Sequence, residues 1–530
     1  MPSLKQTLRH VFDGGWATDF GTIAEVGIAP DGLVRIPFLT EAKNVTYELD
    51  GGTHKIGGTT RMNATQFAGG AEMVGLYDFW QQVPGSSPTQ LIMCHAGTVV
   101  GAAALDGDFT DVSTATVGAL TDDAVPSYST FDDLLIVASD GTGANDEPAS
   151  YDGTTYQKLA GSPPHFSFSE FHKNRLWAAG NNGAPSRLYF SAFVDPEVWS
   201  AAGGAGFIDI DPNDGDRITA IASHKDNLWV FKGPYSGSIH RIVGSAPTGS
   251  DSFGRQTFVR GLGCVAHNTV FRFRDDLGFM WSDGSIHSLA ATASFGDFNE
   301  AALSQPINGW LSDHVNGSRL THAWAATDSV KGIVLFTLAT DSSTTNNTHL
   351  MMDYRFQRPR WAFWTAFSSG SVASVVDSGV KRLFGGSNDG YARRLLKSAR
   401  SIDGLTNIAA NTVTPFMSYA SPHITKTLER VSVGITPKGK YNLDFGWTRD
   451  EHADQTQSVD QNAAGTALGS FVLGISTLGG ATYADRFMSL EEGGEFRQIQ
   501  YRVSNAGISE DLEVHMISTT INRGAESSEN

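Results

Sequence analysis

Asn174-Arg-Leu-Trp, followed after a turn by Ser186-Arg-Leu-Tyr-Phe, is a pattern that this chain repeats. It returns as Asp226-Asn-Leu-Trp-Val-Phe with Gly237-Ser-Ile-His-Arg-Ile, and as Asp276-Leu-Gly-Phe-Met-Trp with Asp283-Gly-Ser-Ile-His. Each time an Asp or Asn leads into an apolar run, and a strand of mixed polarity comes next. A continuous apolar run is typical of a strand that is covered on both faces. The pattern therefore predicts the same type of β-hairpin at three places in the chain.

Apolar runs of this kind recur at an even spacing along most of the chain. Their centres, which lie about 42 to 55 residues apart, are Ile92, Leu135, Trp177, Trp229, Phe279, Val334 and Leu383. Periods of this length are typical of β-propeller blades. A β-sandwich, the alternative, would space its strands by about 8 to 12 residues without the longer period. We predict an all-β chain in which residues 65–404 form a β-propeller of six to eight blades.

The pattern changes after about residue 405. Longer alternating strands, such as Leu428-Glu-Arg-Val-Ser-Val-Gly-Ile, predict an additional antiparallel β-sandwich-like C-terminal domain over residues 405–522. Residues 523–530 have no apolar anchor and are expected to form a mobile tail. A ring closed by strands from both ends of the chain resists opening, so we expect an early or late segment to complete a blade. The C-terminal domain is one candidate for that closure.

Residues 1–64 are assigned to an N-terminal segment of a short helix plus strands. The apolar positions that fit one helix face are Leu4, Leu8, Val11 and Phe12. The first residues contain no continuous apolar signal-peptide region, and the longest apolar stretch, residues 91–105, is shorter than a membrane helix of about 18 residues. We therefore expect neither a visible secretion signal nor a membrane span.

The composition argues against several classes of protein. Lys plus Arg number 38 against 56 for Asp plus Glu, which gives a net charge of −18. A field of this sign repels phosphate backbones, so tight DNA binding by the whole surface is not expected. Cys94 and Cys264 are far apart and belong to no C-x-x-C pair, so neither a disulfide framework nor a cysteine zinc site is expected.

Familiar catalytic motifs are missing from the sequence, which has no G-x-S-x-G, H-E-x-x-H or G-x-x-x-x-G-K-[ST] pattern. Propeller glycosidases collect carboxylates from different blades, and sequence spacing does not display such a pair. The aspartates that precede apolar runs are Asp132, Asp133, Asp226, Asp275 and Asp276. Their repetition favours a structural turn role, because catalysis needs one special pair whereas every blade needs a turn. We expect no catalytic residue and no enzyme activity.

The best candidate for a metal loop lies between residues 209 and 216. Asp209, Asp211 and Asp214 offer oxygen ligands of the kind that calcium prefers. However, Asp214 stands where an EF-hand needs its glycine, and Ala220 stands where it needs its glutamate. Asx turns between strands are the favoured interpretation, and calcium is the weaker one. No other metal and no cofactor is expected.

Positive charge gathers with aromatic residues between Tyr354 and Arg400. Arginine and aromatic side chains are enriched at protein interfaces, so this region favours docking on another acidic subunit. A solvated face and a nucleic-acid or sugar site are the alternatives. The subunit-interface candidates are Arg355, Arg358, Arg360, Arg393 and Arg394.

About half of the chain resembles a known family. The resemblance is carried by Phe171-His-Lys-Asn-Arg-Leu-Trp-Ala-Ala-Gly, Pro185-Ser-Arg-Leu-Tyr-Phe-Ser-Ala, Asp195-Pro-Glu-Val-Trp, Asn227-Leu-Trp-Val-Phe-Lys and Gly261-Leu-Gly-Cys-Val-Ala, and by the closing strands from Phe496 to Ile521. These stretches are similar to the β-propeller nozzle, or tail-tube, proteins of short-tailed bacteriophages. The matching motifs are structural blade motifs.

The resemblance implies a structural virion protein without enzyme activity: a homohexameric ring below the portal and adaptor that serves genome retention and ejection. The implied partners are further copies of the chain, the adaptor (head–tail connector) protein, tail fibre or spike proteins, and duplex DNA that passes through the lumen without sequence recognition. The implied location is the virion tail, after assembly in the host cytoplasm. An acidic or neutral lumen would avoid braking the DNA. The alternative is a carbohydrate-binding or depolymerising propeller on a phage fibre or spike.

Overall fold

The computed structural model of this protein contains two compact units. Unit 1 comprises residues 1–59, 351–366 and 396–530, and unit 2 comprises residues 60–350 and 367–395. The structure describes residues 4–12, 14–24, 26, 28–67, 70, 72–81, 89–95, 97–102, 105, 107–113, 115–294, 302–419, 422–439, 441–450, 452–461, 484–488 and 494–523. The predicted tail after residue 523 lies outside these residues.

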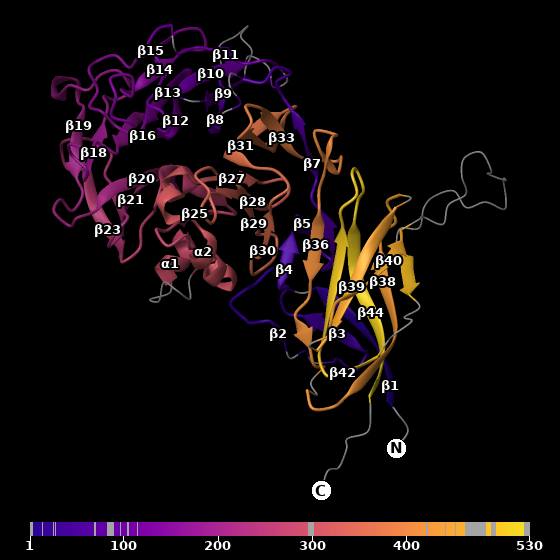
Figure 1. Ribbon diagram of the computed structural model, residues 1–530. Helices are drawn as coiled ribbons and strands as arrows, with labels where there is room; N and C mark the ends of the chain where they lie inside the picture. The colour runs from indigo at the N-terminus through magenta and orange to yellow at the C-terminus, as the bar shows by residue number, and fades with distance from the viewer. Residues whose placement is uncertain are drawn as a thin grey trace. The chain divides into compact units, whose positions relative to one another are not determined.

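Unit 2 is a β-propeller, as the sequence predicts. Its antiparallel strands form sets that follow one another around a ring (Figure 1): β8–β11, β12–β15, β16–β19, β20–β23, β24–β26, β27–β29 and β31–β33. Six of these sets belong to separate small sheets, and β27–β29 belongs to a longer sheet. The first strands of most neighbouring sets contact one another, and β20 contacts η3 (His267–Thr269), which precedes β24. Strand β31 contacts β8, so the ring of blades is closed. The described sets fall within the predicted range of six to eight blades.

The strands of the ring are short. They are β8 (Met73–Trp80), β9 (Thr89–His95), β10 (Thr98–Ala102), β11 (Thr110–Asp111), β12 (Pro126–Phe131), β13 (Leu134–Ser139), β14 (Ala149–Tyr151), β15 (Tyr156–Lys158), β16 (Phe168–His172), β17 (Arg175–Ala179), β18 (Arg187–Phe190), β19 (Gly206–Asp209), β20 (Arg217–His224), β21 (Asn227–Gly233), β22 (Ser238–Val243), β23 (Gly254–Arg260), β24 (Phe271–Phe273), β25 (Asp276–Met280), β26 (Ile286–Ser288), β27 (Trp324–Asp328), β28 (Ile333–Leu338), β29 (Thr348–Asp353), β31 (Ser369–Asp377), β32 (Val380–Ser387) and β33 (Ala392–Lys397).

Helices of the described residues are short. They are η2 (Ala201–Gly203), η3 (His267–Thr269), α1 (Leu289–Ser294), η4 (Gln305–Ile307), α2 (Asn308–His314) and η5 (Gly317–His322). None of them is long and apolar enough to cross a membrane.

The apolar runs of the sequence form the second strand of each set. Leu176 of β17 packs with Ile136 of the preceding set. Its neighbour Trp177 points the other way and packs with Leu228 of the following set. Burial on both faces explains why these runs are apolar throughout instead of alternating.

The repeated tryptophans are equivalent in two blades but not in the third. Trp177 and Trp229 are each the third residue of their strand, and each packs toward the following set. Trp281 instead follows the end of β25, where Gly278 takes the third place. A Cβ at Gly278 would lie 2.1 Å from the ring of Phe271, so that ring already fills the space. Trp281 is therefore not equivalent to Trp177 and Trp229.

Tight turns join the first and second strands of the blades. Asp132 and Asp226 adopt positive φ angles of 50° and 59° at these turns, as does Asn174 at 57°. Asp and Asn tolerate this left-handed conformation better than most residues. The structural turn role predicted for these aspartates is confirmed at Asp132 and Asp226.

An early segment completes the blade that β31 begins. Strand β7 (Gly58–Arg61) lies beside β33, and just after it the Met62 amide donates to the Ala392 carbonyl at 2.9 Å. The Asn63 side chain accepts from the Ala392 amide at 2.9 Å and donates to the Gly390 carbonyl at 3.2 Å. The ring is thus closed by a strand from the opposite end of the chain, as expected, and this strand comes from the N-terminal region.

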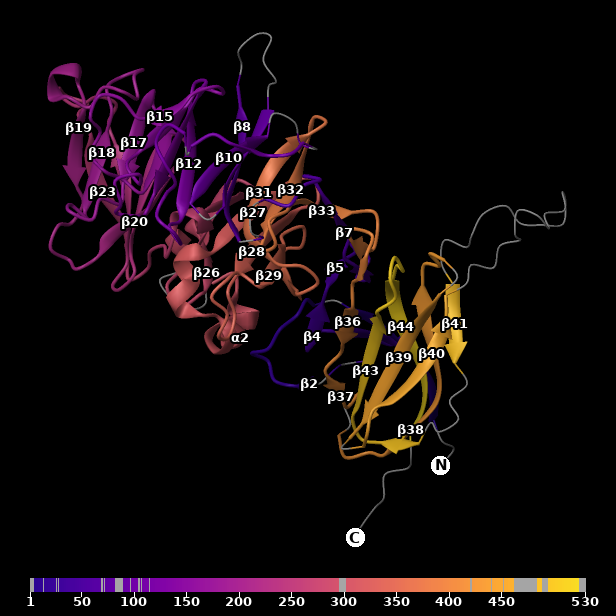
Figure 2. The ribbon, with the colours of Figure 1, turned by 45° about the horizontal axis from the view of Figure 1, so that its top comes forward.

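Most described strands of unit 1 lie in two sheets with mostly antiparallel pairs (Figure 2), and β34 and β35 pair with each other outside these two sheets. One has the order β3-β1-β44-β38-β41, with β42 beside β38, β6 beside β44 and β5 beside β6. The other has the order β2-β37-β43-β36-β4-β30, with β39 beside β43 and β40 beside β39. The strands are β1 (Leu4–Phe12), β2 (Ile23–Ala24), β3 (Leu33–Ile36), β4 (Glu41–Lys43), β5 (Val45–Tyr47), β6 (Thr53–Lys55), β30 (Arg360–Trp364), β34 (Ser401–Ile402), β35 (Thr406–Asn407), β36 (Ala410–Val413), β37 (Phe416–Met417), β38 (Lys426–Ile435), β39 (Asn442–Arg449), β40 (Gln455–Asp460), β41 (Ala484–Met488), β42 (Glu495–Phe496), β43 (Ile499–Asn505) and β44 (Glu513–Arg523).

The two sheets of unit 1 meet at His10. This buried side chain on β1 lies with its Nδ1 2.9 Å from the Ile517 carbonyl and its Nε2 2.8 Å from the Tyr419 hydroxyl. Its ring also makes an edge contact with Tyr501 of β43 in the other sheet, with the ring centroids 5.5 Å apart. The sandwich-like packing predicted for the C-terminal region is present here.

The N-terminal segment corrects two expectations. Residues 4–12 form strand β1 and not a helix, because they pair with β44 along one side and β3 along the other. Leu8, His10 and Phe12 are buried in alternation, which is the period of a strand. The first 59 residues are also not a separate segment, since they share unit 1 with residues 351–366 and 396–530. The boundaries predicted at residues 64 and 404 therefore divide the chain differently from its compact units.

Candidate functional site

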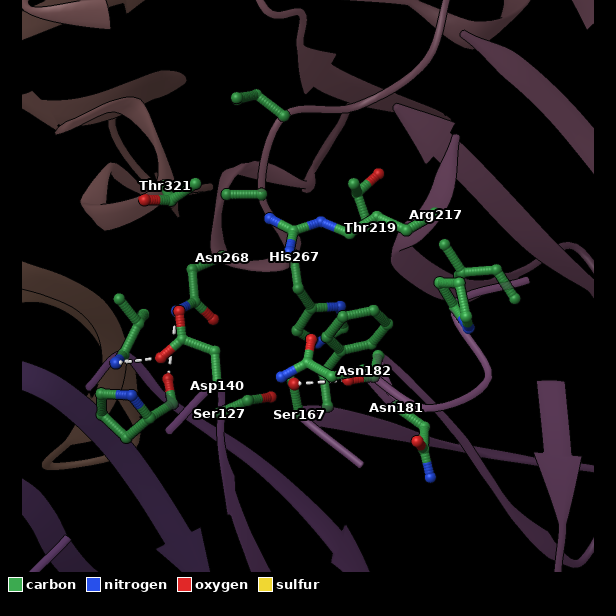
Figure 3. Close-up of a pocket in the computed structure, with 18 residues that line it drawn as sticks. Ser127, Asp140, Ser167, Asn181, Asn182, Arg217, Thr219, His267, Asn268 and Thr321 are labelled. Atoms are coloured by element: carbon green, nitrogen blue, oxygen red, sulfur yellow. Dashed lines mark hydrogen bonds between the residues drawn. The ribbon is translucent and has the colours of Figure 1, made fainter. Parts of the chain in front are cut away.

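A pocket of about 170 Å³ opens in the propeller where the first strands of several blades begin (Figure 3). Its walls include Ser127 at the start of β12, Phe168 at the start of β16 and Arg217 at the start of β20. His267 of η3 and Thr321 of η5 add the segments that precede β24 and β27. Since first strands run in the same direction around a propeller, these residues gather at one end of its axis. We call this site the axial pocket.

Contacts between blades hold the wall of the axial pocket. Asn268 donates from its Nδ2 to the Pro126 carbonyl at 3.1 Å, so η3 is tied to β12. The rings of Phe168 and His267 are stacked, with centroids 4.9 Å apart and an interplanar angle of 9°. The Val125 amide donates to Asp140 at 2.7 Å and fixes that carboxylate beside the pocket.

Several polar groups of the axial pocket have no partner among the described residues. The Ser127 side chain is 5% exposed, yet its Oγ makes no hydrogen bond. The buried Nδ1 of His267 also lacks a partner. Figure 3 shows the Asn182 amide and the Arg217 guanidinium extending into the pocket, whereas the side chain of Asn181, which also lines the pocket, points away from its centre. The Asn181 Oδ1 instead accepts from the Gly183 amide at 2.8 Å.

The charges of the axial pocket are balanced. Burial lowers the pKa of His267 to about 4, so its ring is neutral at physiological pH. Burial raises the pKa of Asp140 above its ordinary value, although the Val125 amide and the charges of His322 and Arg217 oppose this effect. Near neutral pH the pocket therefore offers one cationic group, Arg217, and one acidic group, Asp140.

The predicted interface arginines are divided between the two units. Arg355, Arg358 and Arg360 belong to unit 1, whereas Arg393 and Arg394 belong to unit 2. The five arginines are close in sequence, but they do not form one surface of a single unit.

Two of these arginines are buried and have internal partners. The Arg360 guanidinium lies 3.7 Å from the centroid of Phe356 and donates to the Phe12 carbonyl at 3.3 Å. Arg393 donates to both oxygens of Asp389, at 2.6 and 2.7 Å. Their exposed fractions are only 8% and 6%.

The other three arginines are more accessible. Arg355 pairs with the buried Asp353, with Nη2 2.6 Å from Oδ2. Arg394 pairs with Asp377 at 2.6 Å. Arg358 is exposed. Because Arg355 and Arg394 already have carboxylate partners, the interface prediction rests mainly on Arg358.

The weak calcium candidate lies at Asp209, Asp211 and Asp214, and no group of three or more His, Cys, Asp or Glu side chains that could hold a metal ion is found among the described residues. Asp209 accepts two hydrogen bonds from Arg187, and Asp211 pairs with Arg255 and Arg260. Each of these carboxylates therefore has a basic partner of its own.

Asp214, the third candidate ligand, accepts from the buried Lys232. The Lys232 Nζ lies 2.7 Å from each Asp214 oxygen and also donates to the Ile210 carbonyl at 2.8 Å. These bonds tie the loop after β19 to β21, so the predicted structural role of the loop agrees with the contacts.

Cys94 and Cys264 are buried free thiols.

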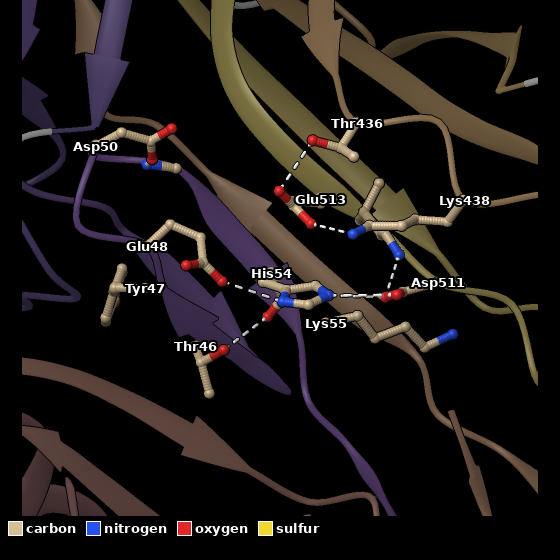
Figure 4. A network of polar contacts seen from close by, with 12 residues as sticks. Thr46, Tyr47, Glu48, Asp50, His54, Lys55, Thr436, Lys438, Asp511 and Glu513 are labelled. Carbon is tan, nitrogen blue, oxygen red and sulfur yellow. Dashed lines mark hydrogen bonds and ion pairs between the residues drawn. The ribbon is translucent and has the colours of Figure 1, made fainter. Parts of the chain in front are cut away.

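Unit 1 also contains a polar network that was not predicted from the sequence (Figure 4). His54 of β6 lies with Nδ1 3.1 Å from Glu48 Oε1 and Nε2 3.0 Å from Asp511 Oδ1. Arg400 also contacts Asp511, at 2.8 Å. Burial lowers the pKa of His54, but the hydrogen bonds to Asp511 and Glu48 outweigh it, so the net shift is upward.

Comparisons with known proteins give no family for this chain. No family model and no curated protein matches it. A chain of the mitotic checkpoint complex aligns over 63% of this chain and 96% of its own length, at 12% identity and a TM-score of 0.38. An ancestral GH74 enzyme aligns over 72% of this chain and 51% of its own, at 8% identity and a TM-score of 0.40. Raptor of Chaetomium thermophilum aligns over 64% and 29%, at 10% identity and a TM-score of 0.37. These scores are too low to carry an argument about function.

Proposed function

We propose that this chain is a structural subunit of a bacteriophage tail nozzle, and that six copies form a ring-shaped conduit for genome retention and ejection. One observation carries the proposal: the residues that resemble the nozzle family form consecutive propeller hairpins, with Asn174 at the turn before β17 and Asp226 at the turn before β21. On this proposal the ring lies in the virion tail, assembles in the host cytoplasm and needs no catalytic residue.

The charge of the chain supports a conduit rather than a DNA-binding protein. A net charge of −18 disfavours the phosphate contacts that would slow a passing duplex. The proposed partners are the adaptor protein above the ring and fibre or spike proteins around it. DNA is a passenger that is not read by sequence.

The proposal is tested by the mass of the purified protein and by one charge reversal. Light scattering should give about six times the monomer mass. Arg358→Glu should shift the population toward smaller species, because an exposed arginine at an interface contributes register and specificity. Lys381→Glu reverses another exposed charge and is the control. A wild-type protein that stays monomeric at every concentration would contradict the proposal.

A second function, glycan depolymerisation on a fibre or spike, makes a different prediction. It requires release of oligosaccharides from a polysaccharide by the purified chain. Under the conduit proposal no release occurs.

A further inference from the structure

The axial pocket presents donors and acceptors that the described protein residues do not use. Buried polar atoms are usually paired, so each one that is not calls for an explanation. Ser127 Oγ and His267 Nδ1 are such atoms, and both belong to the pocket wall. The Asn182 amide and the Arg217 guanidinium point into the same space (Figure 3).

The charge balance of the pocket restricts what it can hold. An anion such as phosphate would be attracted by Arg217 but repelled by Asp140. A cation would be attracted by Asp140 but repelled by Arg217. An uncharged ligand with several hydroxyl groups avoids both penalties. Each hydroxyl both donates and accepts, so it can satisfy Arg217 and Asn182 as donors and Asp140 as an acceptor.

The apolar part of the wall fits the same kind of ligand. Phe168, Val265 and Ile218 line the pocket beside the polar groups. A sugar ring presents C–H groups between its hydroxyls, so it can cover apolar atoms and make hydrogen bonds at once. The volume of about 170 Å³ is below the usual range for drug-sized ligands, about 300 to 1,000 Å³, and suits one ring.

We propose that the axial pocket binds one uncharged saccharide residue through Ser127, Asn182, Arg217 and Asp140, with the sugar ring against Phe168. This binding goes beyond the conduit role and does not depend on it. It requires no catalysis. The ligand would be a single residue of a larger glycan or a free monosaccharide, since both present the same ring.

Saturation-transfer NMR on the full chain tests the proposal. The probes are the methyl glycosides of glucose, galactose, mannose and N-acetylglucosamine, with glucuronate and inorganic phosphate for comparison. At least one neutral glycoside should bind with a Kd of the order of millimolar, as expected for a ligand of this size. The anions should bind more weakly.

Adjacent asparagines supply a matched pair of variants. Asn182→Ala should weaken binding about five-fold, because one hydrogen bond to the ligand is lost. Asn181→Ala should leave binding unchanged, since that side chain serves its own loop. Ser127→Ala should weaken binding as Asn182→Ala does. Because Asn182 is exposed, its variant remains informative if Ser127→Ala fails to fold.

Three outcomes would overturn the proposal. One is that none of the neutral glycosides binds at about 50 mM, well above the expected Kd. Another is that phosphate or glucuronate binds more tightly than every neutral probe. The third is that Asn181→Ala and Asn182→Ala affect binding equally.

Discussion

Lys232 shows how one buried charge fixes a blade. Its Nζ is fully buried and bonds to Asp214, to the Ile210 carbonyl and to the Asp211 carbonyl. Lys232→Met keeps the bulk of the side chain but leaves these acceptors without their donor. We expect a loss of about 3 kcal/mol in the free energy of unfolding, measured by urea denaturation.

Lys225 provides the control for this prediction. It pairs with Asp275 at 2.8 Å, but both side chains are largely exposed, at 55% and 88%. Exposed pairs of this kind contribute little, so Lys225→Met should leave the urea midpoint almost unchanged. Equal losses for the two variants would show that burial of Lys232 does not matter.

His54 and His10 predict opposite effects of pH on unit 1. The folded pKa of His54 is raised, so its stabilising contribution is present below the unfolded value of about 6.5 and is lost as pH rises through the folded pKa. Burial lowers the pKa of His10 to about 4, while a backbone hydrogen bond opposes this. Neutral His10 therefore contributes stability above about pH 6.5, and up to about 3 kcal/mol is lost as pH falls toward 4.

Thermal melts of two variants over a pH series separate these effects. His54→Gln should lower the Tm more at pH 5.5 than at pH 9, because the charged ring is the form that Glu48 and Asp511 stabilise. His10→Gln should remove part of the acid sensitivity of the wild-type protein. The same pH trend in both variants would contradict the assignment.

At the scale of elements, Asn63 is expected to hold the closing strand in place. It is buried and bonds to Ala392, Gly390 and the Thr65 carbonyl. Asn63→Ala should lower the free energy of unfolding by about 2 kcal/mol, because the buried Ala392 amide loses its partner. The measurement is the urea midpoint.

Gln66 is a matched amide for comparison. Its Nε2 also bonds to the backbone, at the Asp389 carbonyl, but the side chain is exposed. Gln66→Ala should therefore change the midpoint little. If Asn63→Ala were equally mild, the closure by β7 would not depend on this residue.

The elements that the sequence predicted correctly are those in which local pattern and packing agree. The apolar runs around Leu135 and Trp229 became second strands because each is buried on two faces. Strand β1 was missed because Leu4, Leu8, Val11 and Phe12 also fit a helix, and pairing with β44 decides the outcome. Local sequence does not contain that partner, which lies at the far end of the chain.

The axial pocket could not be predicted for a related reason. These pocket residues come from different blades, and only closure of the propeller brings Ser127, Arg217 and His267 together. The burial of two arginines of the predicted interface could not be read from the sequence either. Arg360 and Arg393 are close to exposed positions in sequence, but internal partners bury them.

At the scale of the whole molecule, the negative net charge of the chain predicts that the assembled conduit binds duplex DNA only weakly. A conduit that carries a net charge of −18 per chain should not bind duplex DNA at physiological salt. The measurement is a salt series of electrophoretic shifts with a random duplex. Tight binding with a steep salt dependence would mean a basic lumen and would contradict the ejection mechanism.

The central claim is that copies of this propeller chain assemble into an open ring. Electron microscopy of the purified protein, alone and with duplex DNA present, tests it most directly. The account predicts six-fold rings with an axial opening wide enough for a duplex and without DNA fixed to the wall. Particles that remain single propellers, or rings whose centre is closed by protein, would contradict it.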